Sequence, residues 1–211
     1  YFPKKQGFDI NIGGCEMGNP GPDGYFSPYN IKNLEDGQKG EYLTDRLTNE
    51  AINLIKSNDD KPFYLNLDYY AVHTPIMGKD KYVEKYRKKK ESLGLNQVQT
   101  FEEGDNFPTE HKKHLKIKRR LVQSDPEYAA MIQSVDDNVG RLIKTLEEIG
   151  ETENTVIVFY SDNGGLATAE GSPTCNSPLS EGKGWMYEGG TREPLIIKWP
   201  GVIAPDSICR E

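Results

Sequence analysis

A long amphipathic stretch that leads into a β-branched run is the feature that most constrains this chain. Residues 124–150 carry apolar side chains at helical spacing, begin with Ser-Asp-Pro-Glu and end at a glycine. A capping Ser, a Pro in the first turn and a Glu three residues after the cap are typical of a helix start, and Gly is typical of a helix end. Residues 155–161, Thr-Val-Ile-Val-Phe-Tyr-Ser, then predict a buried strand. A helix followed at once by such a strand favours folds that pack helices against a sheet.

Four further segments extend this pattern. Residues 43–57 place their apolar side chains on one face and predict a helix, and residues 79–90 predict a charged helix. Residues 63–70 are apolar on both faces and predict a strand inside a sheet, and residues 195–199 predict a last strand between two prolines. Helices alternating with apolar strands predict an α/β sandwich with a mostly parallel central sheet.

Residues 91–123 interrupt the pattern, because they combine weak periodicity with many charges. We interpret them as a charged insertion in a chain that otherwise forms one domain over residues 1–211. The basic stretches 79–90 and 111–120 are interpreted as solvated faces, including His111 and His114.

Composition excludes several classes of protein. Lys and Arg total 26 against 33 Asp and Glu, a net charge of -7, which disfavours a globally basic nucleic-acid binder. No apolar run approaches the roughly 20 residues that a membrane helix needs. The three Cys form no CxxC pair and the three His form no HxxxH pair, so a zinc cluster is disfavoured.

Two polar groups follow predicted strands directly. Asp162 and Asn163 come after the strand at 155–161, and His73 comes shortly after the strand at 63–70. Ligands of parallel sheets bind beyond the carboxyl ends of the strands. Carboxylate and amide oxygens suit Ca²⁺ or Mg²⁺, and a His there can donate to an anionic oxygen or a leaving group. The alternatives are a plain Asn-Gly turn and a His satisfied by a nearby backbone carbonyl.

Two cationic side chains lie in glycine-rich loops. Lys183 stands between Gly182 and Gly184, an arrangement that brings an ammonium group and bare backbone close to an anion. A flexible surface loop is the alternative. Arg192 precedes the last strand; it could clamp an oxyanion, but we favour a buried Arg–carboxylate pair that holds the loop.

Together these motifs resemble the type I, formylglycine-dependent sulfatases of the alkaline phosphatase superfamily. The resemblance covers the chain apart from residues 91–123, and it rests on the order of the motifs. In chain order they are Tyr42-Leu43-Thr44-Asp45-Arg46-Leu47-Thr48, Pro62-Phe63 with Ala71-Val72-His73-Thr74-Pro75, Tyr128-Ala129-Ala130-Met131, Ser134-Val135-Asp136, Val139-Gly140-Arg141, Ser161-Asp162-Asn163-Gly164-Gly165, Gly182-Lys183-Gly184, Glu188-Gly189-Gly190-Thr191-Arg192-Glu193-Pro194 and Trp199-Pro200-Gly201.

The resemblance implies roles for four residues. Asp162 and Asn163 match ligands of the active-site Ca²⁺, with Mg²⁺ the less favoured ion. His73 matches the residue that contacts the sulfate and the leaving group, and Lys183 matches the lysine that contacts the sulfate. The implied activity is a sulfuric ester hydrolase acting on sulfated carbohydrates or aryl sulfate esters, in a periplasmic, secreted or lysosomal-type compartment.

The family's nucleophile is absent from the 211 residues. Formylglycine is made from a (Cys/Ser)-x-Pro-x-Arg motif; the nearest match, Ser124-Asp125-Pro126-Glu127-Tyr128, ends in Tyr. We therefore expect the chain to be the central part of a sulfatase, with the nucleophile upstream, and to be inactive alone. The alternatives are a phosphatase or phosphodiesterase of the same superfamily and a non-catalytic domain that binds sulfated glycans.

Overall fold

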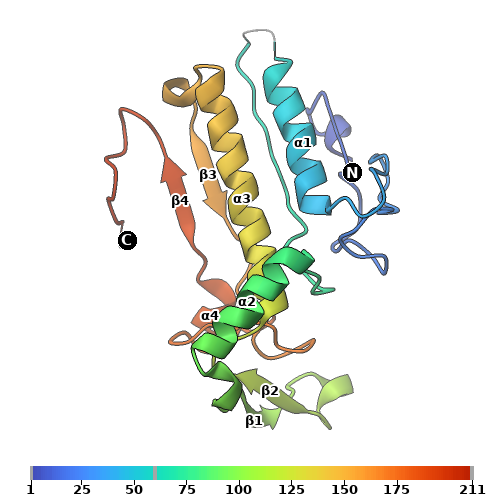
Figure 1. The fold of residues 1–211 in the computed structure, drawn as a ribbon, viewed down its shortest axis with the longest axis vertical. Coiled ribbons are helices and arrows are strands. Elements are labelled where there is room, and N and C mark those ends of the chain that lie inside the picture. The colour runs from blue at the N-terminus through green and yellow to red at the C-terminus, as the bar shows by residue number, and fades with distance from the viewer. Residues whose placement is uncertain (1, 59–60, 210–211) are drawn as a thin grey trace. The chain divides into compact units, whose positions relative to one another are not determined.

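The computed structural model describes residues 2–58 and 61–209, which divide into two compact units: residues 1–83 with 127–150, and residues 84–126 with 151–211. The helices and strands of the α/β chain (Figure 1) are α1 (Leu43–Lys56), α2 (Asp80–Ser92), β1 (Phe101–Asn106), β2 (Lys116–Arg120), α3 (Pro126–Glu148), β3 (Ile157–Tyr160), α4 (Glu188–Thr191) and β4 (Leu195–Lys198). The predicted helices at 43–57, 79–90 and 124–150 and the predicted strands at 155–161 and 195–199 are confirmed. Within the described residues, no helix is both long and apolar enough to cross a bilayer.

In the first unit α1 and α3 lie side by side (Figure 1). Their apolar faces contribute to a core that includes Leu43, Leu47 and Met131. A polar clamp adds specificity: Asp45 Oδ1 on α1 accepts hydrogen bonds from Asn138 Nδ2 on α3 and from Lys79 Nζ, both at 2.7 Å. The amphipathic pattern of each helix therefore identified the face that it buries.

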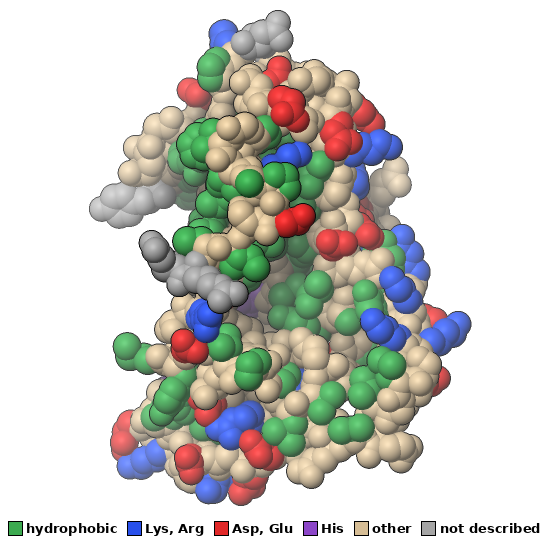
Figure 2. Space-filling view, turned by 90° about the vertical axis from the view of Figure 1, so that its left-hand side faces the viewer, with side chains coloured by type: hydrophobic (Ala, Val, Ile, Leu, Met, Phe, Trp, Pro, Cys, Tyr) green, Lys and Arg blue, Asp and Glu red, His purple; other side chains and the backbone are tan. Residues whose placement is uncertain are grey.

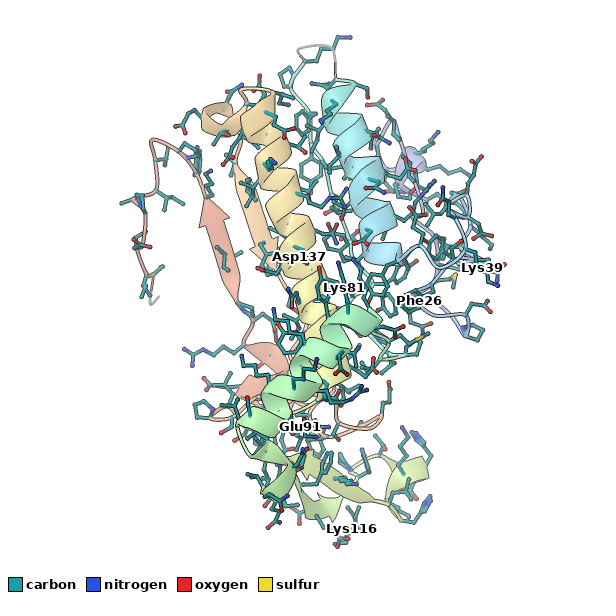
Figure 3. The ribbon with its side chains drawn as sticks, in the orientation of Figure 1. Phe26, Lys39, Lys81, Glu91, Lys116 and Asp137 are labelled. Carbon is teal, nitrogen blue, oxygen red and sulfur yellow. The ribbon has the colours of Figure 1, made fainter. Side chains whose placement is uncertain are left out.

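Aromatic rings fix the N-terminal loops to this core. The Tyr42 ring stacks on the Tyr25 ring with centroids 5.6 Å apart. Phe26, which is labelled in Figure 3, meets the Tyr42 ring edge-on at 5.1 Å. The Tyr42 hydroxyl donates to the carbonyl oxygen of Met77 at 2.8 Å. Offset aromatic pairs of this kind contribute beyond their buried area, so the irregular segment before α1 is well anchored.

The predicted buried strand at 63–70 is wrong. Residues 63–70 form no strand: Leu67, Tyr69 and Tyr70 pack against the core, whereas Tyr64 is 77% exposed. The Tyr69 hydroxyl hydrogen-bonds Thr48 Oγ1 at 2.7 Å. Asn66 and Asp68 are exposed, so polar side chains interrupt the buried pattern that a central strand would need.

In the second unit β1 and β2 form an antiparallel hairpin within the segment 91–123, which the sequence did not predict. A register shift between Glu103 and Asn106 interrupts the ladder. Most side chains of the hairpin are exposed, including Lys116 (Figure 3), but Ile117 and Arg120 are buried. The charged strands lack apolar alternation, which explains why sequence periodicity missed them.

The predicted mostly parallel sheet is not confirmed. β3 and β4 pair antiparallel, with Ile157 opposite Lys198 and Tyr160 opposite Leu195, and the only other sheet of the described residues is the β1–β2 hairpin. A parallel pair needs a crossover long enough to return the chain to the same end of the sheet, usually a helix. Between β3 and β4 the only helix of the described residues is the four-residue α4.

Both faces of β3 and β4 carry exposed apolar side chains, and hydrophobic side chains are visible at the surface in Figure 2. The exposed members on these strands are Val158, Phe159, Tyr160, Leu195, Ile196 and Ile197. Apolar character on both faces is what led the sequence analysis to a parallel sheet, but it does not fix strand direction.

Candidate functional site

Three glycine-rich loops of the second unit hydrogen-bond directly to one another. We call residues 161–165, which follow β3, the acid loop, residues 180–185 the lysine loop, and residues 188–190 the α4 start. The Lys183 N–H donates to the Gly165 carbonyl at 3.1 Å, and the Gly164 N–H donates to the Gly190 carbonyl at 3.2 Å. The Gly189 N–H donates to the Ser180 carbonyl at 2.8 Å. The structure therefore joins the two predicted motifs that contain Asp162, Asn163 and Lys183.

The glycines of these loops are required by close backbone approach. A Cβ on Gly164 would lie 1.8 Å from the carbonyl oxygen of Gly189, and a Cβ on Gly182 would lie 2.2 Å from that of Gly165. Both distances are far below normal contact, and both obstacles are backbone atoms. Any side chain at these two positions would force the loops apart.

Asn176 is the side chain on which the three loops converge, and the sequence analysis did not identify it. Its Nδ2 donates to the carbonyl of Gly165 at 2.8 Å and of Glu181 at 2.9 Å, and it lies 3.2 Å from that of Gly189. The acceptors come from distant parts of the chain, so no local sequence signal marks this residue.

The acid loop presents oxygen atoms outward. Asp162 is exposed, and within residues 2–58 and 61–209 its carboxylate has no hydrogen bond or ion pair. Asn163 directs its Nδ2 to the Gly164 carbonyl at 3.2 Å, while its own carbonyl accepts from Ser161 Oγ at 2.9 Å. That arrangement leaves the side-chain oxygen of Asn163 available as a ligand.

The charge around Asp162 fits a cation. Burial raises the pKa of the Glu193 carboxyl, and the negative charge of Asp162 raises it further. One carboxylate oxygen of Glu193 is buried without a hydrogen-bond partner among the described residues. Hard oxygen donors with unbalanced negative charge suit Ca²⁺ or Mg²⁺. No group of three or more His, Cys, Asp or Glu side chains with metal-site geometry occurs in the described part of the chain.

The lysine loop is anchored to the β1–β2 hairpin. Arg119 on β2 pairs with Glu181, two residues before Lys183, and with Glu102 on β1 at 2.9 Å. Both hydrogen bonds raise the pKa of Arg119, and the one to Glu102 has the larger effect. Lys183 itself is half-buried and has no ion-pair partner among the residues that the structure describes, so its ammonium group is available to an anion.

A second arginine of the hairpin is buried in the same unit. Arg120 is 7% exposed; it donates to the Ser172 carbonyl and to Ser124 Oγ at 3.2 Å, and it pairs with Asp125 at 3.3 Å. Burial lowers its pKa. The interpretation of residues 111–120 as a solvated face is therefore wrong at Arg119 and Arg120, although His111 and His114 are exposed as expected.

The prediction that Arg192 forms a buried ion pair is wrong. Arg192 pairs with Glu188 at 3.6 Å, but its side chain is 67% exposed, so the pair is not buried. Exposed pairs one helical turn apart contribute about 0.3–0.5 kcal/mol, which is too little to hold a loop.

His73 lies in the first unit. Its Nδ1 is 3.0 Å from the carbonyl oxygen of Thr74, which can only accept, and 3.3 Å from the Thr74 hydroxyl, which can donate or accept. The turn is held by Tyr25, whose hydroxyl is 2.7 Å from the Tyr70 carbonyl and 2.8 Å from that of His73. Burial raises the pKa of Tyr25, so this hydroxyl stays a donor. Convergence of His73 with Asp162 and Lys183 stays a prediction.

Comparison with known proteins places these motifs in a family. The Sulfatase family model matches residues 1–210. A sulfatase of Formosa agariphila is 36% identical over 178 residues, which cover 80% of this chain and 27% of that protein. Arylsulfatase J of Mus musculus is 28% identical over 221 residues, which cover 100% of this chain and 31% of that protein.

A solved structure agrees. Ps i-CgsB, solved in complex with k-i-k-neocarrahexaose, matches with a TM-score of 0.56 and 32% identity over 80% of this chain and 30% of that chain. The chain thus spans less than a third of the length of these relatives. The matched region and the order of its motifs show that this chain belongs to the sulfatase family.

Proposed function

We propose that the chain supplies the metal-loop and lysine-loop part of a sulfatase that hydrolyses sulfate monoesters. The observation that carries the proposal is the direct hydrogen bonding of the acid loop to the lysine loop, with Lys183 N–H on the Gly165 carbonyl at 3.1 Å. This contact holds a candidate cation site and a free ammonium group on adjacent backbone. A sulfate ester carries negative charge on its oxygens, and preorganised positive charge is a large catalytic contribution in such a site.

Lys183 and His73 have separate roles in this proposal. The Lys183 ammonium binds a sulfate oxygen and offsets the charge that develops during S–O cleavage. His73 offers Nε2 as a hydrogen-bonding group; when protonated there, it donates to the leaving-group oxygen.

The residues present fit a divalent cation. Asp162 and Asn163 would hold Ca²⁺, and Glu193, with its unpartnered oxygen, adds negative charge beside them. The bound ion would supply Lewis-acid stabilisation of the sulfate oxygens. Ca²⁺ takes six to eight oxygen ligands, so further ligands must come from outside these loops.

The nucleophile is proposed to come from outside the 211 residues, because they contain no (Cys/Ser)-x-Pro-x-Arg motif. We propose that the substrates are sulfated carbohydrates, with aryl sulfates as useful reporters. Support comes from the likeness to Ps i-CgsB, whose structure holds an oligosaccharide. The 211 residues alone are proposed to be inactive.

Sulfate release tests the proposal. The complete gene product, meaning the protein encoded by the whole gene from which these residues come, should release sulfate from an aryl sulfate in the presence of Ca²⁺. The matching aryl phosphate serves as the comparison substrate. Turnover of the phosphate alone would reject the sulfatase assignment, and turnover of neither ester would reject hydrolysis at this site.

A further inference from the structure

We propose that Asn176 is a positioning residue that sets the lysine loop against the acid loop. The inference rests on the proposed function of those two loops. Asn176 is not placed on the substrate; it acts through the backbone that carries Lys183 on one side and Asp162 and Asn163 on the other.

The contacts of Asn176 explain why an amide stands there. Its Nδ2 faces carbonyl oxygens of Gly165, Glu181 and Gly189 at 2.8–3.2 Å. Carbonyl oxygens only accept, so the three dipoles that converge on this point need a donor. A carboxylate of the same shape would face three acceptors with negative charge, and an alanine would leave them unpaired.

Hydrogen bonds of the neighbouring backbone hold Asn176 in place. The preceding residues are clamped by Gln123, which accepts from the Cys175 N–H at 2.9 Å and donates to Thr174 Oγ1 at 2.6 Å. The carbonyl of Asn176 accepts from the Leu179 N–H at 2.9 Å. A side chain with this support is preorganised, so its hydrogen bonds are formed at low entropic cost.

Side-chain packing contributes little to this arrangement. Gly164, Gly182 and Gly189 carry no side chains, and their backbones approach too closely for any. Hydrogen bonds therefore replace side-chain packing at this junction. Without the Asn176 amide the lysine loop can shift, and a misplacement of about 1 Å in a catalytic group costs about 100-fold in rate.

The test uses the complete gene product with Asn176→Asp as the main variant and Asn138→Ala as the matched control. Asn138 is also an amide with two donated hydrogen bonds, to Asp45 and Ser134, but it lies in the first unit. The measurements are kcat and KM for an aryl sulfate and amide hydrogen exchange of residues 161–190. If Asn176→Asp does not fold, Asn176→Ser, whose hydroxyl keeps one donor, carries the test.

We expect Asn176→Asp to lower kcat by about 10- to 100-fold with a smaller change in KM. In Asn176→Asp, hydrogen exchange should become faster at the amides of Lys183 and Gly189. The control Asn138→Ala should lower the unfolding temperature but leave loop exchange and the kcat of the folded protein unchanged. Parental kcat and parental loop exchange in Asn176→Asp would overturn the inference, as would an equal loss of kcat in Asn138→Ala. If the parent releases no sulfate, the proposed function fails, and the exchange measurement still decides the role of Asn176.

Discussion

Replacement of Gly182 by alanine should loosen the junction between the acid loop and the lysine loop. The added Cβ would lie 2.2 Å from the Gly165 carbonyl oxygen, 2.7 Å from Asn176 Nδ2 and 3.0 Å from the Ala167 nitrogen. Two of these three atoms belong to the backbone and cannot rotate away. The two loops must separate, which stretches the hydrogen bond from Lys183 N–H to Gly165.

The magnitude follows from the cost of overpacking. Forcing an extra methyl group into a close-packed site costs about 1–3 kcal/mol. At about 1.4 kcal/mol for each factor of ten, the local opening constant should rise about 5- to 150-fold. The backbone conformation of Gly182 adds no further cost, because its φ lies outside the left-handed region.

Hydrogen exchange of the Lys183 amide in the complete gene product measures this opening directly. Gly140→Ala is the control: Gly140 lies within α3 and its added Cβ meets no atom within 4 Å. That control should stabilise the protein by about 0.5–1 kcal/mol, because alanine loses less backbone entropy than glycine in a helix. Exchange in Gly182→Ala as slow as in the parent would refute the close approach of the loops.

Three further outcomes are expected. Lys183→Met, which keeps the length of the side chain and removes its charge, should lower kcat for aryl sulfates by about 100-fold or more, since a charge aimed at the transition state is lost; unchanged kcat in steady-state assays would remove Lys183 from the site. Asp162→Ala should weaken Ca²⁺ binding in calorimetry. The 211 residues alone should also bind Ca²⁺ more weakly than the complete gene product; equal Ca²⁺ affinities of these two proteins would contradict a coordination shell shared with residues outside the 211. Unfolding free energy should fall as pH rises from about 10 toward 12, because tyrosines ionise near 10 in the unfolded chain while burial raises the pKa of Tyr70 to about 12. The fall should be shallower in Tyr25→Phe, which removes another buried tyrosine of raised pKa, and a flat urea-denaturation profile across that range would contradict the burial of these hydroxyls.

The sequence predicted the helices well, because their apolar faces are buried in the way that periodicity indicates. Residues 43–57 and 124–150 have long amphipathic patterns, and both helices were observed within two residues of the predicted bounds. Strand pairing was predicted poorly. Apolar side chains on both faces of β3 and β4 do not determine strand direction, and the exposed Asn66 and Asp68 interrupt the buried pattern of the segment at 63–70.

The sequence predicted the motifs of the candidate site but not the residues that hold them together. The motifs at Asp162 and Lys183 were found from residue type: a carboxylate indicates a ligand for a cation, and an ammonium group indicates a site for an anion. Asn176 and Arg119 were missed, since their roles come from partners distant in sequence: the Gly165 carbonyl for one and the Glu181 carboxylate for the other. Such contacts depend on how loops fold back on one another, which local spacing does not encode.

Diffraction from crystals of the complete gene product grown with Ca²⁺, recorded at a wavelength where calcium scatters anomalously, tests the central claim most directly. We expect an anomalous peak at about 2.3–2.6 Å from side-chain oxygens of Asp162 and Asn163. Lys183 should face a sulfate bound to that ion. An anomalous peak elsewhere, with Asp162 and Asn163 in solvent and Lys183 directed away from the sulfate, would contradict the central claim.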